Sequence, residues 1–210
     1  MYSLPYFKEK NKESILAFMK AHSFAMLIGC TAEFPVATQV PLLFDERGDK
    51  LFLRGHIMRN TDHHKALTKN SNVLCVFTGA HTYVSARLYN NPQVGSTWNY
   101  MTVHAKGTIK FLEENQLINI LKETTTHYEN DAASPASFEN LSPKYVTDLA
   151  KAIAGFEIEV VAIENVFKLS QNRDEDEYKR IVEHLETGTE DAKVVASEMQ
   201  KRTGTLFHKA

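Results

Sequence analysis

The chain has 210 residues, of which 43% are hydrophobic and 10% aromatic, so it can bury one substantial core but is short for two. The formal net charge of −2 at pH 7 provides no long-range attraction for a phosphate backbone or an anionic bilayer, which makes direct nucleic-acid binding doubtful. No apolar run reaches the roughly 18 to 20 residues that span a bilayer, and the first residues lack the pattern of a secretion signal. We therefore expect a cytoplasmic protein with no membrane association.

The first half of the chain predicts a helix followed by short strands. Apolar residues recur at helical spacing at 12–22, whereas the segments that follow are apolar or alternate. A cluster of turn residues at 45–49 predicts a hairpin. The elements expected after the first helix are strands at 24–30, 36–44 and 51–56, a short helix at 60–67 capped by Asn60, and a central strand at 73–77, with a further strand near Val84.

The second half predicts one long strand and several helices. Residues 102–112 alternate cleanly, so one face of this strand is core and the other is wet or faces a ligand. We expect helices at 114–128 and 143–154, a strand at 156–160 that resumes near Phe167, a helix that begins near Asp174 and ends before Gly188, and a weakly anchored helix and tail at 189–210. With no alternation of strand and helix, the pattern favours an α+β protein built on an antiparallel barrel.

Cysteines and histidines give no sign of a metal or redox centre. Cys30 and Cys75 lie in apolar runs without the spacing of a zinc or redox motif, so both are predicted to be buried, reduced thiols. The nine histidines form no known metal-binding pattern, and no metal is expected. The sequence also lacks the motifs of α/β hydrolases, P-loop proteins and dinucleotide-binding folds.

Three polar segments are candidates for a functional site. Residues 53–65 place Arg and His at a strand end before a helix N-terminus, which suits a monophosphate; ordinary surface charge is the alternative. Residues 97–104 contain the single Trp and a Tyr, which could stack on a planar ring or pack in a core. Residues 168–173 are almost all hydrogen-bonding and could contact a ligand or cap a helix.

Taken together, these segments resemble the PaiB-type family of FMN-binding negative transcriptional regulators. The similarity extends from residue 1 to about residue 187 and rests on separate blocks in the right order and spacing. The matching blocks are Ala-Thr-Xxx-Xxx-Pro at 37–41, Arg-Gly-His at 54–56 with Asn60, Gly-Ala-His-Thr-Tyr-Val-Ser at 79–85, Thr-Trp-Asn-Tyr and Val-His within 97–104, Gly-Phe-Glu-Ile at 155–158, and Lys-Leu-Ser-Gln-Asn-Arg at 168–173.

The resemblance implies an antiparallel split β-barrel with flanking helices, like that of pyridoxine phosphate oxidases, and a homodimer with FMN between subunits. It implies one FMN-binding domain at 1–187 with helical insertions, followed by a C-terminal helix and tail at 188–210. The implied phosphate ligands are Arg54, His56, Asn60, Arg59 and Lys65. The residues implied to border the ring or ribityl chain are Thr38, Gln39 and Pro41. Those implied to close the pocket, partly from the partner subunit, are Trp98, Asn99, Tyr100, Gln171, Asn172 and Arg173. Gly55 and His104, which lie in matching blocks, are also implied to bind the cofactor.

The chain departs from the family pattern at several positions. The family usually has His at Gln39, Pro at Ala80, and a Pro-Ser-Trp-Tyr run at 86–89. Leu88 removes an aromatic ring near the expected pocket mouth, so we expect a different preference for substrate or effector.

The resemblance leaves several functions open. In one, the chain is a negative transcriptional regulator that acts indirectly, through a partner or a small molecule. In another, it is a flavin-dependent oxidoreductase on an unknown small molecule, with only Tyr100, His104 and His81 as candidate acids or bases. Haem handling, with a His ligand, is a third and smaller possibility. The sequence does not decide whether the chain is an enzyme.

Overall fold

The computed structural model describes residues 1–2, 4–131 and 133–207, and it forms two compact units. Unit 1 consists of Met1–Met19, Thr78–Val103 and Glu164–Ala210, and unit 2 of Lys20–Phe77 and His104–Ile163. No helix in the described part of the chain is both long and apolar enough to cross a membrane.

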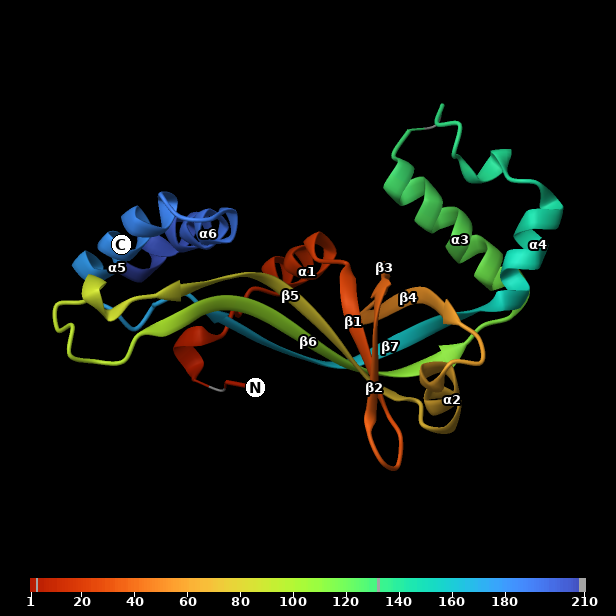
Figure 1. Cartoon of the computed structure of the whole chain (residues 1–210), viewed down its shortest axis with the longest axis horizontal. Helices are drawn as coiled ribbons and strands as arrows, with labels where there is room; N and C mark the ends of the chain where they lie inside the picture. The colour runs from red at the N-terminus through yellow and green to blue at the C-terminus, as the bar shows by residue number, and fades with distance from the viewer. Residues whose placement is uncertain (3, 132, 208–210) are drawn as a thin grey trace. The chain divides into compact units, whose positions relative to one another are not determined.

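Strands and helices are labelled in Figure 1 in chain order. The strands are β1 (Phe24–Cys30), β2 (Pro35–Pro41), β3 (Leu43–Arg47), β4 (Lys50–Met58), β5 (Asn72–Val84), β6 (Thr97–Phe111) and β7 (Ile153–Lys168). The helices are α1 (Lys12–Ala21), α2 (Asp62–Lys69), α3 (Glu114–Glu129), α4 (Pro143–Ala152), α5 (Glu175–Glu186) and α6 (Glu190–Phe207). Short 3₁₀ turns are η1 (Pro5–Phe7), η2 (Ala86–Leu88) and η3 (Phe138–Asn140).

Unit 2 is a barrel because the two edges of its sheet are joined by a single residue. The strand order is β2-β1-β5-β6-β7-β4-β3, so β2 and β3 lie at opposite ends of the sheet. Only Leu42 separates them in the chain; it is 2% exposed, and its N–H donates to the Ser23 carbonyl at 3.0 Å. A sheet whose two edge strands are consecutive in this way must curl until its edges meet.

The closing edges approach most closely at Gly55 of β4. A Cβ atom at Gly55 would lie 3.0 Å from the Pro41 carbonyl oxygen of β2 and 2.9 Å from Cζ of Phe156. A residue without a side chain is therefore needed at this crossing. The predicted strand at 36–44 is accordingly wrong in its extent: Pro41 has no N–H to continue the ladder, and the chain turns at Leu42 into a new strand.

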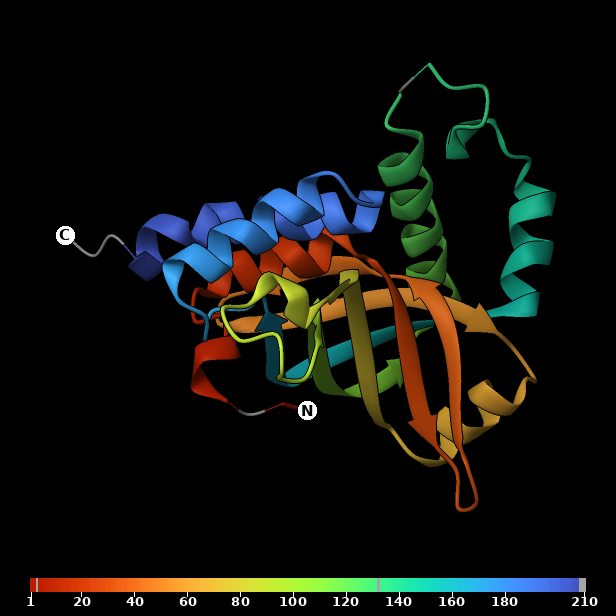
Figure 2. The same cartoon turned by 60° about the vertical axis from the view of Figure 1, so that its left-hand side comes forward.

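Helix α2 packs beside the β1–β2 hairpin (Figure 2). Leu67 of α2 lies over Gly29 of β1, where a Cβ atom would be 2.6 Å from its Cδ2. The N-cap lies one residue after the Asn60 cap predicted from the sequence: Thr61 caps the helix, which begins at Asp62, and its hydroxyl oxygen accepts the His64 N–H at 3.1 Å. Asn60 instead takes a left-handed conformation, with φ of 64°, in the turn before the cap.

Helices α3 and α4 share a small core of their own within unit 2. The buried residues of this core are Leu117, Leu121, Ala150 and Ile153, with Phe138 and Leu149 packed against them. Helix α4 ends at Ala152, and Ile153 already belongs to β7, so the predicted helix at 143–154 is two residues too long.

In unit 1, α5 and α6 pack together. Helix α5 begins after Asp174, whose carboxylate accepts the Glu177 N–H at 2.8 Å, and it buries the predicted residues Tyr178, Ile181, Val182 and Leu185. The weak anchoring expected for 189–210 is wrong for the helix at 190–207, and residues 208–210 lie outside the described residues. Helix α6 buries Ala192, Val195, Ala196 and Met199, and the Tyr178 hydroxyl donates to the Met199 carbonyl at 2.9 Å.

The long strands are more continuous than the sequence predicts. β5 runs through Gly79, which is buried, so the residues near Val84 extend the central strand and do not form a separate one. β6 shows the predicted alternation of buried and open positions, but it begins at Thr97 and therefore includes Trp98. β7 is a single strand through 156–167. Of the two cysteines, Cys75 is buried as predicted and Cys30 is exposed at the end of β1.

Substitution of Gly55 tests the closure of the barrel. We expect Gly55→Ala to lower the free energy of unfolding by about 1–3 kcal/mol, because the new methyl group overlaps Phe156 and the Pro41 carbonyl. Urea denaturation measures the difference. Gly95→Ala is the matched control, since a Cβ there meets no atom within 4 Å. Equal stability of the two variants would contradict the tight crossing.

Candidate functional site

The predicted cationic strand end of β4 carries Arg54, but carboxylates already surround its guanidinium. Its Nη1 and Nη2 donate to the two carboxylate oxygens of Glu123 on α3 at 3.2 and 2.6 Å. Asp45 Oδ2 is 3.7 Å from Arg54 Nε, which is buried and has no hydrogen-bond acceptor among the described residues. The side chain is 19% exposed. Arg54 is therefore charge-compensated within unit 2, and an added phosphate would meet two carboxylates there.

His56 shares the open face of β4 with Arg54, since Gly55 between them points to the other face. Burial lowers the pKa of His56. Its Nδ1 is buried and has no partner in the part of the chain that the structure describes. The imidazole is thus a neutral group with hydrogen-bonding capacity to spare, and it does not add a positive charge near neutral pH.

The turn into α2 holds two cations that, unlike Arg54, are not paired with a carboxylate among the described residues. Arg59 and Lys65 are both exposed, and neither makes an ion pair within 4 Å with any described residue. The backbone of the turn is fixed, because the Arg59 N–H donates to the Ala152 carbonyl at 2.9 Å and the Asn60 N–H lies 3.4 Å from Nδ1 of His64. Burial, and then the neighbouring Arg59 cation, lowers the pKa of His64. Two available positive charges thus flank an ordered turn.

The β2 residues have different environments. Thr38 is half-buried on the same face as Val40, whereas Gln39 is exposed on the opposite face and is paired with Met26 of β1. Pro41 is half-buried at the barrel crossing. His104 is half-buried on β6, on the face opposite to Val103. All these positions belong to unit 2.

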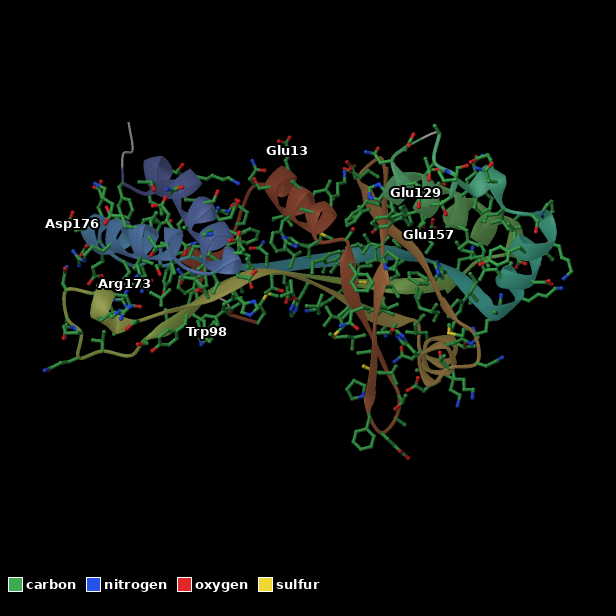
Figure 3. The ribbon with its side chains drawn as sticks, turned by 45° about the horizontal axis from the view of Figure 1, so that its top comes forward. Glu13, Trp98, Glu129, Glu157, Arg173 and Asp176 are labelled. Atoms are coloured by element: carbon green, nitrogen blue, oxygen red, sulfur yellow. The ribbon has the colours of Figure 1, made fainter. Side chains whose placement is uncertain are left out.

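In unit 1, Trp98 belongs to an exposed aromatic face of β5 and β6. Its ring centroid lies 5.9 Å from those of His81 and Tyr83, and the two larger rings are about half exposed, at 53% for Trp98 and 52% for Tyr83. Figure 3 shows Trp98 on the side of the strands away from α5 and α6. The aromatic face is therefore available for stacking, as the sequence suggested.

Asn99 and Tyr100 are less accessible. Asn99 is fully buried; its amide donates to Met199 Sδ at 3.5 Å and accepts from the Ser170 hydroxyl at 3.1 Å. The amide nitrogen and oxygen of this side chain are both bonded within the core of unit 1. Tyr100 is half-buried, and burial, with a smaller effect from Tyr2, raises the pKa of its hydroxyl.

The 168–173 segment forms a self-bonded turn before α5. The Gln171 amide accepts the Leu169 N–H at 2.7 Å and donates to the Phe167 carbonyl at 2.5 Å, while Ser170 has a φ of 61°. Arg173 stacks on the Tyr89 ring at 3.6 Å, and Asn172 is exposed. The N-cap of α5 is Asp174, so the helix-capping role expected for 168–173 is wrong, and Gln171 instead bonds the turn that follows β7.

Two groups of residues near these positions were not anticipated from the sequence. Glu123 neutralises Arg54 from a helix distant in sequence, and no motif marks it. Lys69 lies one helical turn after Lys65, a spacing that is visible in the sequence, and both line a cavity with Cys30 and Glu33. The described residues contain no group of three or more His, Cys, Asp or Glu side chains that could hold a metal ion.

Comparison with known proteins connects this geometry to a family. A family model described as "Putative FMN-binding domain" matches residues 1–162. The curated relative "Protease synthase and sporulation protein PAI 2" of Bacillus subtilis (strain 168) is 34% identical over 186 residues, which are 89% of each chain.

Two solved structures share the fold. A conserved hypothetical protein from Mycobacterium tuberculosis matches with a TM-score of 0.55 and 10% identity, over 80% of this chain and 91% of that chain. The FAD and haem binding protein from Mycobacterium smegmatis matches with a TM-score of 0.54 and 16% identity, over 81% and 78%. At these identities the likeness is one of fold alone. The predicted α+β class, an antiparallel split barrel with flanking helices, is confirmed.

The buried histidines of unit 2 predict a loss of stability in acid. Burial lowers the pKa of His56, His63 and His64 from the ordinary value of 6.5, so the unfolded chain binds more protons than the folded chain once the pH falls below that value. The stabilisation that these neutral histidines give the folded state is therefore present above pH 6.5 and is lost as the pH falls below that value. We expect the free energy of unfolding to fall between about pH 7 and about pH 5 in urea titrations.

His63 is the sharpest probe of this effect, because it is 4% exposed and both of its ring nitrogens lack partners among the described residues. His63→Leu should flatten the pH dependence. His184→Leu, at an exposed position on α5, is the control and should not. An unchanged slope in His63→Leu would show that His63 titrates as freely in the folded chain as in the unfolded one.

Proposed function

We propose that this chain, which belongs to the PaiB-type family of FMN-binding domains, holds FMN on the barrel of unit 2 and acts as a negative regulator of gene expression. Regulation of protease synthesis and sporulation is suggested by the name of the Bacillus subtilis relative. Bound FMN would supply the redox chemistry and the visible absorption of the protein.

The observation that carries the proposal is the pair of unpartnered cations at the start of α2. Arg59 and Lys65 flank an ordered turn and have no carboxylate partner among the described residues, so a phosphate dianion would gain charge-assisted contacts without displacing one. The Arg59 and Asn60 N–H groups of this turn are already bonded, to the Ala152 carbonyl and to His64, so the side chains of Arg59, Asn60 and Lys65 are the groups that remain for a phosphate. The residues present therefore fit a terminal phosphate, and we assign it to Arg59, Asn60 and Lys65.

Arg54 and His56 have a supporting part in this assignment. A phosphate at Arg54 would have to replace Glu123, which holds the guanidinium through two hydrogen bonds. The unpartnered Nδ1 of His56 and Nε of Arg54 could each donate one hydrogen bond to the cofactor. Gly55, between them, keeps β4 close to β2 and needs no contact with FMN.

For the ring, the exposed amide of Gln39 and the neighbouring Thr38 and Pro41 offer polar and apolar contacts on β2. We propose a homodimer, in which the aromatic face of a second copy, including Trp98 and Tyr100, contributes to covering the flavin. The exposure of Trp98 supports this, since the described part of unit 1 leaves its ring largely open. In the turn before α5, Asn172 and Arg173 have side-chain donors available for a flavin bound to a second copy. The side chains of Asn99 and Gln171 are hydrogen-bonded within their own chain.

Indirect regulation is supported by the charge of the helices. α5 and α6 are joined by the short segment 187–189, as in helix-turn-helix units, but α6 begins with Glu190 and Asp191. Carboxylates at that N-terminus would repel DNA phosphates. The net charge of −2 offers no compensating attraction. The regulatory signal would therefore pass through a partner protein or a small molecule.

The phosphate assignment predicts which cations FMN binding needs. We expect Arg59→Gln and Lys65→Gln each to weaken FMN binding by roughly 10- to 100-fold, the equivalent of about 1.5–3 kcal/mol for a charge-assisted contact. Quenching of flavin fluorescence measures the affinity. Lys144→Gln, on α4, is the control and should bind as the wild type does. Full affinity in both α2-turn variants would refute the assignment, and colourless protein that ignores added FMN would refute the function.

Assembly and DNA binding can be tested in one experiment. Light scattering coupled to size exclusion of the FMN-loaded protein with promoter DNA, at about 0.15 M salt, should give the mass of two chains with the DNA eluting separately. A stable protein–DNA complex would replace the indirect mechanism with a direct one. A strict monomer that still binds FMN tightly would contradict the contribution from a second copy.

A further inference from the structure

A second cavity of unit 2 lies between α2 and the turn of the β1–β2 hairpin (Figure 2). It has a volume of about 600 Å³, within the range of roughly 300–1,000 Å³ that small-ligand pockets occupy. Its side chains are polar, charged or small, and no aromatic or long apolar side chain is among the described residues that line it. A ring or a bulky apolar group would therefore find no surface to pack on, whereas a small polar molecule would fit.

Contacts between the two walls and within the hairpin turn hold this cavity in shape. Leu67 of α2 lies over Gly29 of β1, where a Cβ atom would be 2.6 Å from the leucine Cδ2. The turn is held by Thr31, whose hydroxyl donates to the Phe34 carbonyl at 2.6 Å and accepts the Glu33 N–H at 3.2 Å. The cavity is therefore formed before a ligand arrives, and binding needs little reorganisation of the chain.

Opposite charges line the cavity without pairing. The α2 wall contributes Asp62, Lys65 and Lys69, and the hairpin wall contributes Glu33. All four are exposed, and none lies within 4 Å of an opposite charge among the described residues. By contrast, four other lysines of unit 2 each form an ion pair of 3.0 Å or less. The charged groups at the cavity are thus available to a ligand of complementary charge.

The two carboxylates of the cavity have different positions relative to the lysines. Asp62 precedes Lys65 by one helical turn on the same wall, and its Oδ1 accepts the His63 N–H at 2.7 Å. Its charge offsets that of Lys65, so the positive charge of the α2 wall is centred on Lys69. Glu33 is on the opposite wall, and its carboxylate has no partner among the described residues. The cavity therefore presents a cation on one wall and an anion on the other.

This arrangement favours a zwitterion whose two charges are well separated. A dicarboxylate would be repelled by Glu33, and a diamine would be repelled by Lys69. In a free amino acid the ammonium and carboxylate groups share one carbon atom and cannot reach both walls. In a peptide the two ends are separated by roughly 3.3–3.6 Å per extended residue. The amide of Asn70, whose Oδ1 accepts the Asn72 N–H at 3.1 Å, keeps its NH₂ group available for a peptide carbonyl.

We propose that this cavity binds a short peptide of small residues with both termini free, as an effector of the protein. Lys69 binds the carboxylate of the peptide, Glu33 binds its ammonium group, and Asn70 donates to a carbonyl between them. The lack of an apolar lining limits the side chains of the peptide to small ones. The reaction that supplies such a ligand is the hydrolysis of longer peptides.

The peptide and FMN oppose each other, because Lys65 belongs to both sites. The proposed phosphate cradle consists of Arg59, Asn60 and Lys65, and Lys65 also lines the cavity. A carboxylate beside Lys65 repels the phosphate and competes for the same charge, and the effect of each ligand on the other is equal by linkage. Peptide binding itself goes beyond the proposed function, whereas this opposition rests on it.

Calorimetric titration of the full chain with trialanine tests the proposal. We expect binding in the wild type, and Lys69→Gln and Glu33→Gln each to weaken it about tenfold, since each removes one charge-assisted contact. The N-acetylated and C-amidated forms of trialanine lack one charge each and should bind the wild type about tenfold more weakly. Lys144→Gln, at a lysine of α4 that does not line the cavity, is the control and should bind as the wild type does.

Cys30 provides an independent readout of occupancy. It is exposed and lines the cavity, whereas Cys75 is buried, and burial raises the pKa of the Cys75 thiol to about 12, which makes it unreactive. Alkylation of the native protein by iodoacetamide should therefore report on Cys30 alone. Trialanine should slow this reaction in the wild type, and the same concentration should protect much less in Lys69→Gln and Glu33→Gln.

The opposition to FMN is measured by flavin fluorescence. Saturating trialanine should raise the Kd of FMN for the wild type about fivefold. Lys69→Gln should retain the wild-type affinity for FMN, because Lys69 is outside the cradle, and should lose this effect at the same trialanine concentration.

The outcomes separate this inference from the proposed function. No binding of trialanine, or equal binding of its capped forms, would overturn the inference and leave the FMN proposal standing. Binding that neither Lys69→Gln nor Glu33→Gln weakens would place the peptide elsewhere and overturn the assignment to this cavity. Unchanged FMN affinity in the presence of bound peptide would overturn the opposition alone. Protein that binds trialanine but not FMN would overturn the proposed function and support the peptide site.

Discussion

The one-residue connection between β2 and β3 is the constraint on which unit 2 depends. Because Leu42 alone joins the two edges of the sheet, the strands close into a barrel, and β4 must cross β2 at Gly55. That crossing fixes where β4 ends and hence where the turn at Asn60 and helix α2 begin. The proposed phosphate cradle is therefore a product of barrel closure, and its position does not depend on the cofactor.

Within this frame, electrostatics divides the cations of unit 2 into two classes. Arg54 is held by Glu123 and approached by Asp45, so its charge is used in joining α3 to the barrel. Arg59, Lys65 and Lys69 have no such partners among the described residues and are free to receive an anion. Removing Glu123 would leave this mostly buried guanidinium with Asp45, 3.7 Å from its Nε, as its remaining charged partner, which costs more than losing an exposed pair.

Sequence patterns predicted the features that depend on residues close together in the chain and missed those that depend on residues far apart. The alternation at 102–112, the helix starting after Asp174 and the family blocks were all readable, because each depends on residues close in sequence. The break at Leu42 was not, since the alternation continues through it, and neither was Glu123, which is 69 residues from Arg54. Thr61 and Asn60 are both competent caps, and only the backbone conformation decides between them.

The aromatic face of unit 1 also makes the protein its own spectroscopic reporter. The chain contains a single tryptophan, and its ring is half exposed beside His81 and Tyr83. All indole emission therefore originates from one spot on the surface. Whatever comes to rest there, whether another protomer or an absorbing isoalloxazine, shifts or quenches that signal without any label, so intrinsic emission gives a direct view of events at this face.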